Sequence, residues 1–228
     1  MTEDNATTSR GSLEFRQNQE DIKSGKIPEK YSRMLPYVKG RRILEIGSAE
    51  GVFALLLSKE KDKVYGLEQN LNRHKKALEL QRSWESQGID VSKCEMIHDN
   101  IFERLDLLEK VDTVFSSRCI YYFKENIYTC FNEIGKKIKN VTLCGNHKRA
   151  KRFETCKGRF LAGHLLILMQ KLGLNRILGR NLDMNLGFYE YFASKRGMEN
   201  LLIRNGYEIT DINDDASKDV IIVGEKQF

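Results

Sequence analysis

The segment 42–57 constrains the fold of this chain more than any other part of the sequence. It reads Arg-Ile-Leu-Glu-Ile-Gly-Ser-Ala-Glu-Gly-Val-Phe-Ala-Leu-Leu-Leu. The apolar, partly β-branched run that ends at Ile46 is typical of a buried strand, the segment 47–51 predicts a tight turn, and the apolar residues after it favour a helix. A strand, a glycine turn and a helix in this order open a βαβ nucleotide-binding unit. We therefore expect a parallel sheet with a ligand site at the end of its first strand.

The two glycines of this turn have different expected roles. Gly47 can take a backbone conformation that other residues avoid. Gly51 lets either a ligand or the neighbouring strand come close to the main chain. Glu45 ends the strand, at the edge where ligands bind in open α/β sheets.

Length, charge and cysteine usage limit the class of protein. A chain of 228 residues suits one α/β domain with some elaboration. Its 38 Lys and Arg against 32 Asp and Glu give a net charge of +6. This charge favours phosphorylated substrates, nucleic acid or an anionic membrane face as partners, and a basic, solvated surface explains it equally well. The five cysteines form no C-x-x-C pair, so we expect reduced thiols and a cytoplasmic setting.

Several other classes of site and segment lack their sequence signals. The histidines and cysteines show no metal-binding spacing, so we expect no metal site. The first residues contain Glu3 and Asp4 and no apolar core, and they do not read as a secretory signal. No apolar run approaches the ~18 residues that are needed to cross a bilayer. Nothing in the sequence indicates an oligomeric state.

Apolar runs and helix-type segments alternate along the chain after residue 57. Strands alternating with helices at this spacing predict a parallel sheet covered by helices. The last two β-rich runs are joined only by residues 213–219, too few for a crossover helix, so the last strand must return antiparallel to the one before it. Further strands are predicted at 63–67, 94–97, 111–116, 141–144, 207–212 and 220–224, and helices at 71–87 and 125–138.

The remaining segments predict a single domain with additions. Residues 1–12 are small and polar and read as a flexible tail, whereas residues 13–228 form the domain. Within it, we expect residues 13–38 to form one or two helices across the mouth of the sheet. Residues 148–205 far exceed the dozen or so residues that a crossover needs, and we interpret them as an insertion on the substrate side.

Acidic side chains follow the second and third predicted strands as well. Glu68, 23 residues after Glu45, ends the second strand, where a carboxylate can accept hydrogen bonds from both ribose hydroxyls of an adenosine. Asp99 and Asn100 end the third strand, in position for an adenine amino group, and Ile101 can pack on the ring. Capping or solvation explains each acid alone equally well, but the three strand ends together predict a nucleoside site.

The turn distinguishes between nucleoside cofactors. A pyrophosphate prefers helix N-terminal amides without a carboxylate nearby. Glu50 at the helix start therefore disfavours a dinucleotide, and Ala49 stands where a dinucleotide fingerprint has its second glycine. S-adenosylmethionine carries no phosphate, and Glu45 suits its ammonium group.

These residues resemble the motifs of the class I S-adenosylmethionine-dependent methyltransferases. Residues 44–51 look like the glycine-rich first motif of that family, with Ala49 in place of the middle glycine. Glu68 looks like the ribose-binding acid and Asp99 like the adenine-side acid. Residues 112–122 look like the fourth-strand motif.

The resemblance covers about residues 39–144 and the C-terminal hairpin. It implies an α/β fold with a doubly wound, seven-stranded, mostly parallel sheet, an antiparallel last strand and a helical insertion between strands five and six. It also implies S-adenosyl-L-methionine as the cofactor, but it does not extend to the acceptor. The implied cofactor-binding residues are Glu45, Gly47, Ser48, Ala49, Gly51, Glu68, Gln69, Asp99, Asn100, Ile101 and Ser116.

Candidate catalytic residues follow the fourth strand, at the rim of the expected site. In the small-molecule branch of the family this place often carries a histidine pair, and here Tyr121 and Tyr122 stand instead. Tyr122 can orient an acceptor, and Arg118 can hold an anionic group by paired hydrogen bonds. Packing of the tyrosines and a structural salt bridge of Arg118 explain the same residues. His147, after the fifth strand, is a candidate base for a hydroxyl acceptor, or an ordinary loop histidine.

The insertion has three interpretations. Its aromatic residues can close over the site as a lid, which we favour because its glycines weaken a long surface helix. Its basic, amphipathic character also suits an anionic membrane or a lipid-linked substrate. The basic run at 148–152 equally suits RNA phosphates.

The sequence thus predicts a methyltransferase that acts on a small-molecule or carrier-linked acceptor. Oxygen of a sugar or of another biosynthetic intermediate is the favoured methyl acceptor. An RNA methyltransferase is the alternative among enzymes, although sequence-specific nucleic-acid signatures are missing. A cofactor-binding interaction protein without catalysis is the alternative outside them.

Overall fold

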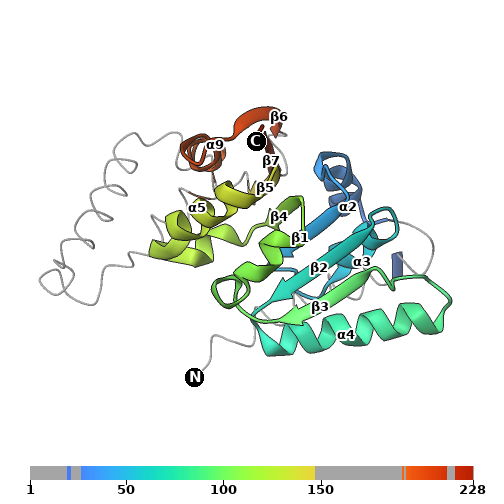
Figure 1. Cartoon of the computed structure of the whole chain (residues 1–228). Helices are drawn as coiled ribbons and strands as arrows, with labels where there is room; N and C mark the ends of the chain where they lie inside the picture. Colours follow the sequence, from blue (N-terminus) through green and yellow to red (C-terminus); the bar gives the residue numbers. More distant parts are fainter. Residues whose placement is uncertain (1–19, 22–26, 147–191, 193, 215–218, 228) are drawn as a thin grey trace, which may run out of the picture.

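Seven strands form one sheet in the order β3-β2-β1-β4-β5-β7-β6 in the computed structural model (Figure 1). The structure describes residues 20–21, 27–146, 192, 194–214 and 219–227. The first five strands run parallel, and β7 pairs antiparallel with both β5 and β6. The strands are β1 (Arg42–Ile46), β2 (Lys63–Glu68), β3 (Cys94–His98), β4 (Thr113–Ser117), β5 (Asn140–Asn146), β6 (Glu208–Asp214) and β7 (Asp219–Glu225).

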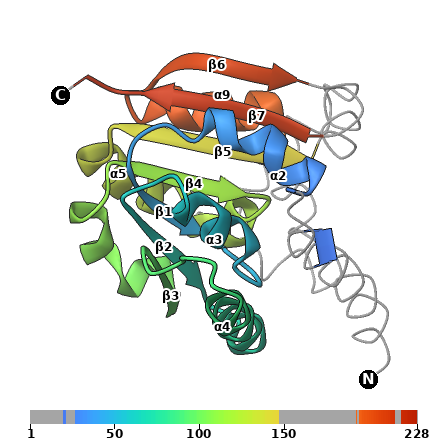
Figure 2. The ribbon, with the colours of Figure 1, turned by 90° about the vertical axis from the view of Figure 1, so that its right-hand side faces the viewer.

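Helices cover both faces of the sheet (Figures 1 and 2). Side chains of α2, α3 and α4 join one apolar cluster with one face of the strands, and α5 and α9 join a second cluster on the other face. The helices are α2 (Glu29–Met34), α3 (Val52–Ser58), α4 (Leu71–Ser86), α5 (Ile127–Lys137) and α9 (Lys195–Arg204). Short 3₁₀ turns are η1 (Leu35–Tyr37), η2 (Ile101–Glu103), η3 (Leu105–Glu109) and η4 (Ile120–Asn126).

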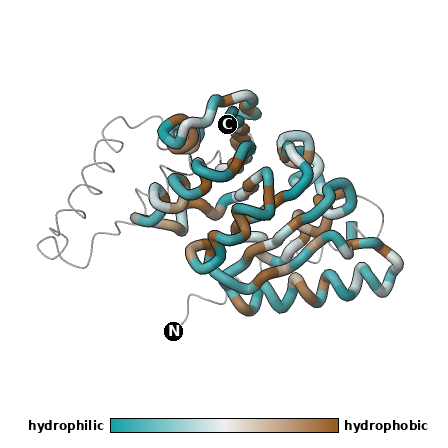
Figure 3. Tube along the Cα trace, viewed as in Figure 1, coloured by the Kyte–Doolittle hydropathy of each residue, from teal (hydrophilic) through white to brown (hydrophobic). Residues whose placement is uncertain are grey.

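Helix α4 shows how local sequence fixes the position of an element. Its buried residues are Ala77, Leu80 and Trp84, which recur at helical spacing, and polar residues lie between them along the helix (Figure 3). The side chain of Asn70 accepts hydrogen bonds from the backbone N–H of Asn72 and Arg73, so the helix starts at Leu71, and only two residues separate it from β2. The polar end of β2 therefore lies beside the first turn of α4.

Alternation along β1 places its acid on the side of α2 and α3. Ile43 belongs to the cluster that contains α2 and α3, whereas Leu44 and Ile46 belong to the cluster that contains α5. Because successive side chains of a strand point to opposite faces, Glu45 points to the same face as Ile43.

The predicted fold class is confirmed, including the seven strands and the antiparallel last strand. Of the expected N-terminal cap at 13–38, the described part forms α2 and η1. The expected tail 1–12 lies outside the described residues. So does most of the insertion 148–205, with most of the aromatic residues proposed for the lid. Its described part includes α9 and Phe192, and Phe192 is buried in the core and packs edge to face on Tyr128, with ring centroids 5.8 Å apart. Among the described residues no helix is long and apolar enough to cross a membrane.

Candidate functional site

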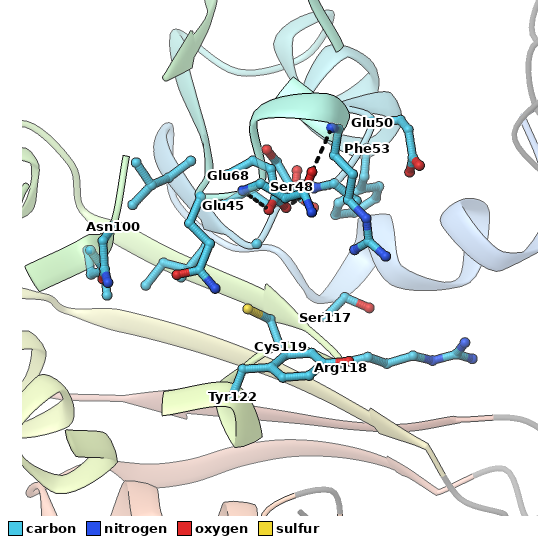
Figure 4. Close-up of a pocket in the computed structure, with 18 of the residues that line it drawn as sticks. Glu45, Ser48, Glu50, Phe53, Glu68, Asn100, Ser117, Arg118, Cys119 and Tyr122 are labelled. Atoms are coloured by element: carbon cyan, nitrogen blue, oxygen red, sulfur yellow. Dashed lines mark hydrogen bonds between the residues drawn. The ribbon is translucent and has the colours of Figure 1, made fainter. Parts of the chain in front are cut away.

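A cavity of about 770 Å³ lies at the carboxyl ends of the parallel strands. Its wall comes from the turn between β1 and α3, the ends of β2 and β3 with their following loops, the segment after β4, and α2. Figure 4 shows Glu45, Ser48 and Glu68 grouped on one side of it and Cys119 and Tyr122 across from them. A cavity of this size is typical of a small-molecule site.

Close packing explains both glycines of the turn. Gly47 has φ +77°, and a Cβ there would stand 2.3 Å from the sulfur of Cys119. Gly51 has φ +76°, and a Cβ would stand 2.6 Å from Cε of Met96 and 2.9 Å from Cβ of Ala77. Gly51 is therefore required for approach to β3 and α4, and it does not line the cavity, whereas Gly47 does.

Ala49 takes the left-handed conformation that the missing middle glycine would adopt without strain. Its φ is 51°, which costs a residue with a Cβ about 1–2 kcal/mol. In this conformation its backbone N–H donates a 2.9 Å hydrogen bond to Oε2 of Glu68. The departure from the motif is thus accommodated, and the turn is tied to the end of β2.

Glu68 is held in place by the main chain on both of its oxygens. Besides the bond from Ala49, its Oε1 accepts a 2.8 Å bond from the N–H of Asn70. The side chain is buried and lines the cavity. A carboxylate has about four lone-pair positions, so it can still accept bonds from hydroxyl groups of a ligand.

Glu45 and Ser48 carry polar atoms that lack a partner. Among the described residues, four buried side-chain polar atoms make no hydrogen bond, and two of them are Oε2 of Glu45 and Oγ of Ser48. Both residues line the cavity, and they are only 4% and 6% exposed. Burial raises the pKa of Glu45 to about 8; the charge of Lys30 opposes this shift and that of Glu68 adds to it. The backbone N–H of Ala54 also lowers this pKa, so the group that lacks a partner is Oε2, and a cationic ligand group is suited to pair with it.

The residues after β3 form the far wall of the cavity. Asp99, Asn100 and Ile101 all line it, as predicted from their positions. Asp99 accepts a bond from the N–H of Asn100, whose own side-chain oxygen accepts one from the N–H of Phe102 and so caps η2. Phe102 and Phe123 meet edge to face at 6.0 Å and add an aromatic wall that sequence reasoning missed.

The candidate site residues at the end of β4 and β5 do not all line the cavity. Ser116 is 1% exposed and donates to the carbonyl of Ile46 at 3.1 Å, so the prediction that it contacts a cofactor is not supported by its position. Ser117 lines the cavity in its place. Its position follows from alternation, because neighbouring residues of a strand point to opposite faces. His147 lies outside the described residues.

Arg118 lines the cavity, but its guanidinium is bound by an acid. Nη2 lies 2.6 and 2.8 Å from the two carboxylate oxygens of Asp219, and Nε lies 3.2 Å from one of them. Its backbone, at φ 54°, donates to the carbonyl of Cys144 at 2.8 Å. Of the two interpretations of Arg118, the structural salt bridge is the one that this geometry supports.

Tyr122 is the exposed aromatic residue of the rim. It lines the cavity and is 57% exposed, whereas Tyr121 is buried and packs against it with ring centroids 4.7 Å apart. Cys119 also lines the cavity, and burial raises the pKa of its thiol to about 12. The thiol is therefore neutral at pH 7.

Several cavity residues were not singled out by sequence reasoning. Three belong to α2, which was expected across the mouth of the sheet without a prediction of the residues facing the site. Of the predicted cofactor-binding residues, Gln69 also lines the cavity. In the part of the chain that the structure describes, no cluster of three or more His, Cys, Asp or Glu side chains is arranged to hold a metal ion. Among the residues that were missed are Lys30, Tyr31, Met34, Phe53, Asn70, Arg73, Phe102, Phe123 and Asn126.

Comparison with known proteins gives the fold. Magnesium protoporphyrin IX methyltransferase (ChlM) from Synechocystis PCC 6803, with bound SAH, superposes with a TM-score of 0.53 at 14% identity over 92% of this chain and 84% of that one. The methyltransferase domain of bacterial CtHen1-C gives 0.56 at 12% identity, over 92% of this chain and 98% of that one. The chain has the fold of the class I S-adenosylmethionine-dependent methyltransferases.

Other methyltransferases of this fold are similar to the chain at the same level. A SAM-dependent methyltransferase from Aquifex aeolicus superposes with a TM-score of 0.53 at 14% identity, over 90% of this chain and 97% of that one. No protein-family model and no curated protein sequence matches the chain. Structures of this methyltransferase fold therefore agree with the chain in architecture at sequence identities too low to carry over an acceptor.

Proposed function

We propose that this chain binds S-adenosyl-L-methionine and transfers its methyl group to a small-molecule or carrier-linked acceptor. The observation that carries the proposal is the buried carboxyl group of Glu45, whose Oε2 has no hydrogen-bond partner, in the same cavity as Glu68. A ligand with an ammonium group at one end and a ribose next to it satisfies both acids. S-adenosylmethionine has these groups, and so the residues present fit the cofactor that the fold implies.

The polar residues of the cavity divide between the parts of the cofactor. Glu45 accepts from the ammonium group, and the Ser48 hydroxyl supplies a further polar contact beside it. Glu68 accepts from the ribose hydroxyls. Asp99 accepts from the adenine amino group, and Ile101 packs against the ring. These assignments follow the strand order, because β1, β2 and β3 are neighbours in the sheet.

The cofactor supplies an electrophilic methyl group on a sulfonium. Methyl transfer is an in-line displacement, so the chain contributes mainly by orienting the acceptor. Tyr122, exposed at the rim of the cavity, orients the acceptor by its ring and hydroxyl. Arg118, bound to Asp219, holds the segment that carries Tyr122. His147 is the proposed base if the acceptor is a hydroxyl.

Oxygen of a sugar or another biosynthetic intermediate is the acceptor that we favour. The cavity holds both aromatic side chains and carboxylates, which suits a polar molecule with an apolar ring face. The RNA alternative depends on the net charge and on the basic run after residue 147, which lies outside the described residues.

The acceptor is tested by transfer of a labelled methyl group from S-adenosylmethionine into a fractionated cell extract. Glu68→Ala serves as the negative control. Label in a small-molecule or carrier fraction supports the proposal, and label in RNA that falls with salt supports the RNA alternative. Tight cofactor binding without label in any fraction would identify a non-catalytic cofactor-binding protein and contradict the proposal.

A further inference from the structure

Three basic side chains line the same cavity as Glu45, and their surroundings differ. Arg118 is bound to both oxygens of Asp219. Arg73 belongs to the first turn of α4, directly after the loop that follows Glu68, and so it lies on the nucleoside side. Lys30 belongs to α2, on the face of the sheet toward which Glu45 points.

The position of Lys30 is set by aromatic packing. Its Nζ lies 5.1 Å from the centroid of the Tyr31 ring, a distance at which a cation is attracted to the ring face. The Tyr31 ring stacks on Phe53, with centroids 5.5 Å apart and planes 18° apart. Lys30, Tyr31 and Phe53 all line the cavity. The ammonium group is therefore held at the wall that faces the β1 end.

Lys30 is also electrostatically coupled to Glu45. Among the basic groups, it is the charge of Lys30 that lowers the pKa of Glu45 against the effect of burial. The ammonium group of Lys30 and the carboxyl group of Glu45 thus line the same cavity within electrostatic range of each other.

We propose that Lys30 binds the carboxylate of the amino-acid part of the ligand, while Glu45 binds its ammonium group. The inference rests on the proposed function, because it presupposes a ligand that carries an α-amino acid. An α-amino acid is a zwitterion, and each of its two charges then meets an opposite charge. Without Lys30 the ligand carboxylate would face a cavity wall that contains Glu45 and Glu50, which repel it. Lys30 is a specificity-determining residue that the sequence motifs do not include.

The test compares two ligands that differ only in the carboxylate. S-adenosylhomocysteine carries it, and decarboxylated S-adenosylhomocysteine keeps the ammonium group and lacks it. Calorimetry measures the dissociation constant of both ligands for the wild-type chain and for Lys30→Gln, Lys30→Arg and Arg73→Gln. Arg73→Gln is the matched control, because it removes the same charge from another wall of the same cavity.

We expect Lys30→Gln to weaken S-adenosylhomocysteine about 10- to 100-fold, the range expected when a hydrogen bond to a charged group is lost. The decarboxylated ligand should bind Lys30→Gln as it binds the wild-type chain. Lys30→Arg should keep most of the affinity for S-adenosylhomocysteine, because it keeps the charge. Arg73→Gln should change the affinities for both ligands by the same factor.

Each of the other possible binding results contradicts one part of the proposal. Equal weakening of both ligands by Lys30→Gln means that Lys30 only supports the wall, and no weakening means that it does not contact the ligand. A carboxylate-specific loss in Arg73→Gln would assign the carboxylate to Arg73 instead. If the wild-type chain binds neither ligand, the proposed function itself fails, and this result differs from all the others.

Discussion

The acidic residues at the two ends of the cavity differ in their hydrogen bonding. At the nucleoside end, both oxygens of Glu68 accept backbone N–H groups, and Asn100 caps the turn that follows β3. At the other end, Glu45 and Ser48 are buried with unpaired oxygens, and the pKa of Glu45 is raised to about 8. The nucleoside end is therefore preorganised by the main chain. The end at β1 leaves Oε2 of Glu45 and Oγ of Ser48 without a partner. Under the proposed function, the ammonium group of the cofactor supplies one.

Removal of Glu68 should have the largest effect, because it breaks the preorganised end. In Glu68→Ala the N–H groups of Ala49 and Asn70 lose their acceptor, and the ribose hydroxyls lose theirs. We expect the affinity for S-adenosylhomocysteine to fall about 100-fold or more, since hydrogen bonds to a charged group contribute about 1.5–3 kcal/mol each. Calorimetry measures the change, with the exposed Glu60→Ala as control. Unchanged affinity would remove Glu68 from the site.

Glu45→Gln should move stability and binding in opposite directions. The folded chain holds the pKa of Glu45 at about 8, against about 4.3 in an unfolded chain. At low pH the carboxyl is protonated in both states, but from about pH 4.3 upwards the unfolded chain ionises first, which favours unfolding until pH 8. Without ligand, Glu45→Gln should therefore raise the free energy of unfolding at pH 8, by at most the ~5 kcal/mol that this difference in pKa represents.

Urea denaturation at pH 8 and at pH 4.5 measures this change, and the gain should vanish at the lower pH. The same substitution should weaken the binding of S-adenosylhomocysteine, because the ammonium group loses its counter-charge. A variant that is less stable than the wild-type chain at pH 8 would show that the carboxylate of Glu45 is stabilised in the free protein by more than the backbone N–H of Ala54. The contrast between the two ends would then be wrong.

Ligand binding should also release a proton. Near pH 7 the free chain holds Glu45 protonated, and the ammonium group of the ligand favours its ionised form. The affinity for S-adenosylhomocysteine should therefore rise about tenfold between pH 6.5 and pH 7.5. Calorimetry in buffers of different ionisation enthalpy counts the proton. Glu45→Gln should bind with no such pH dependence, and a pH-independent wild-type chain would contradict the assignment.

The smallest effect concerns the ion pair beside the cavity. Arg118→Ala and Asp219→Ala should each lower the free energy of unfolding by about 1–2 kcal/mol, with a coupling of about 1 kcal/mol in a double-mutant cycle, because the pair is partly buried and bidentate. The affinity for S-adenosylhomocysteine should stay within about threefold of wild type, as for residues that contact no ligand. If the effects of the two substitutions on the free energy of unfolding are additive, the ion pair does not contribute to stability, and the interpretation of Arg118 as an anion-binding residue is favoured instead.

The parts of the site that sequence reasoning located are those fixed by short-range signals. Gly47, Glu68 and Asp99 stand at the ends of strands that the apolar pattern marks, so their meeting at one edge follows from a parallel sheet. Ser116 shows the limit of the same method. The predicted strand ended at Ser116, one residue before β4 ends. Because successive residues of a strand point to opposite faces, this error of one residue selected Ser116, which points into the core, in place of Ser117, which lines the cavity.

Long-range contacts were invisible in the sequence. The partner of Arg118 is Asp219, 101 residues further along the chain, and no local pattern pairs them. Lys30 belongs to a six-residue helix, too short to show which face meets the sheet, and only the packing of Tyr31 on Phe53 fixes its position. The alternation of strands and helices was thus predictable from local periodicity, and the seven-stranded sheet from the family resemblance, while the charges at the β1 end of the cavity required the folded chain.

Calorimetric titration of the wild-type chain with S-adenosylhomocysteine tests the central claim most directly. We expect one ligand to bind per chain with a dissociation constant of about 1–100 μM, corresponding to about 5–8 kcal/mol, and the binding heat to disappear in Glu68→Ala. An absence of binding heat for the wild-type chain at a ligand concentration of about 1 mM, tenfold above the weakest dissociation constant expected here, would contradict the assignment of the cavity to this cofactor.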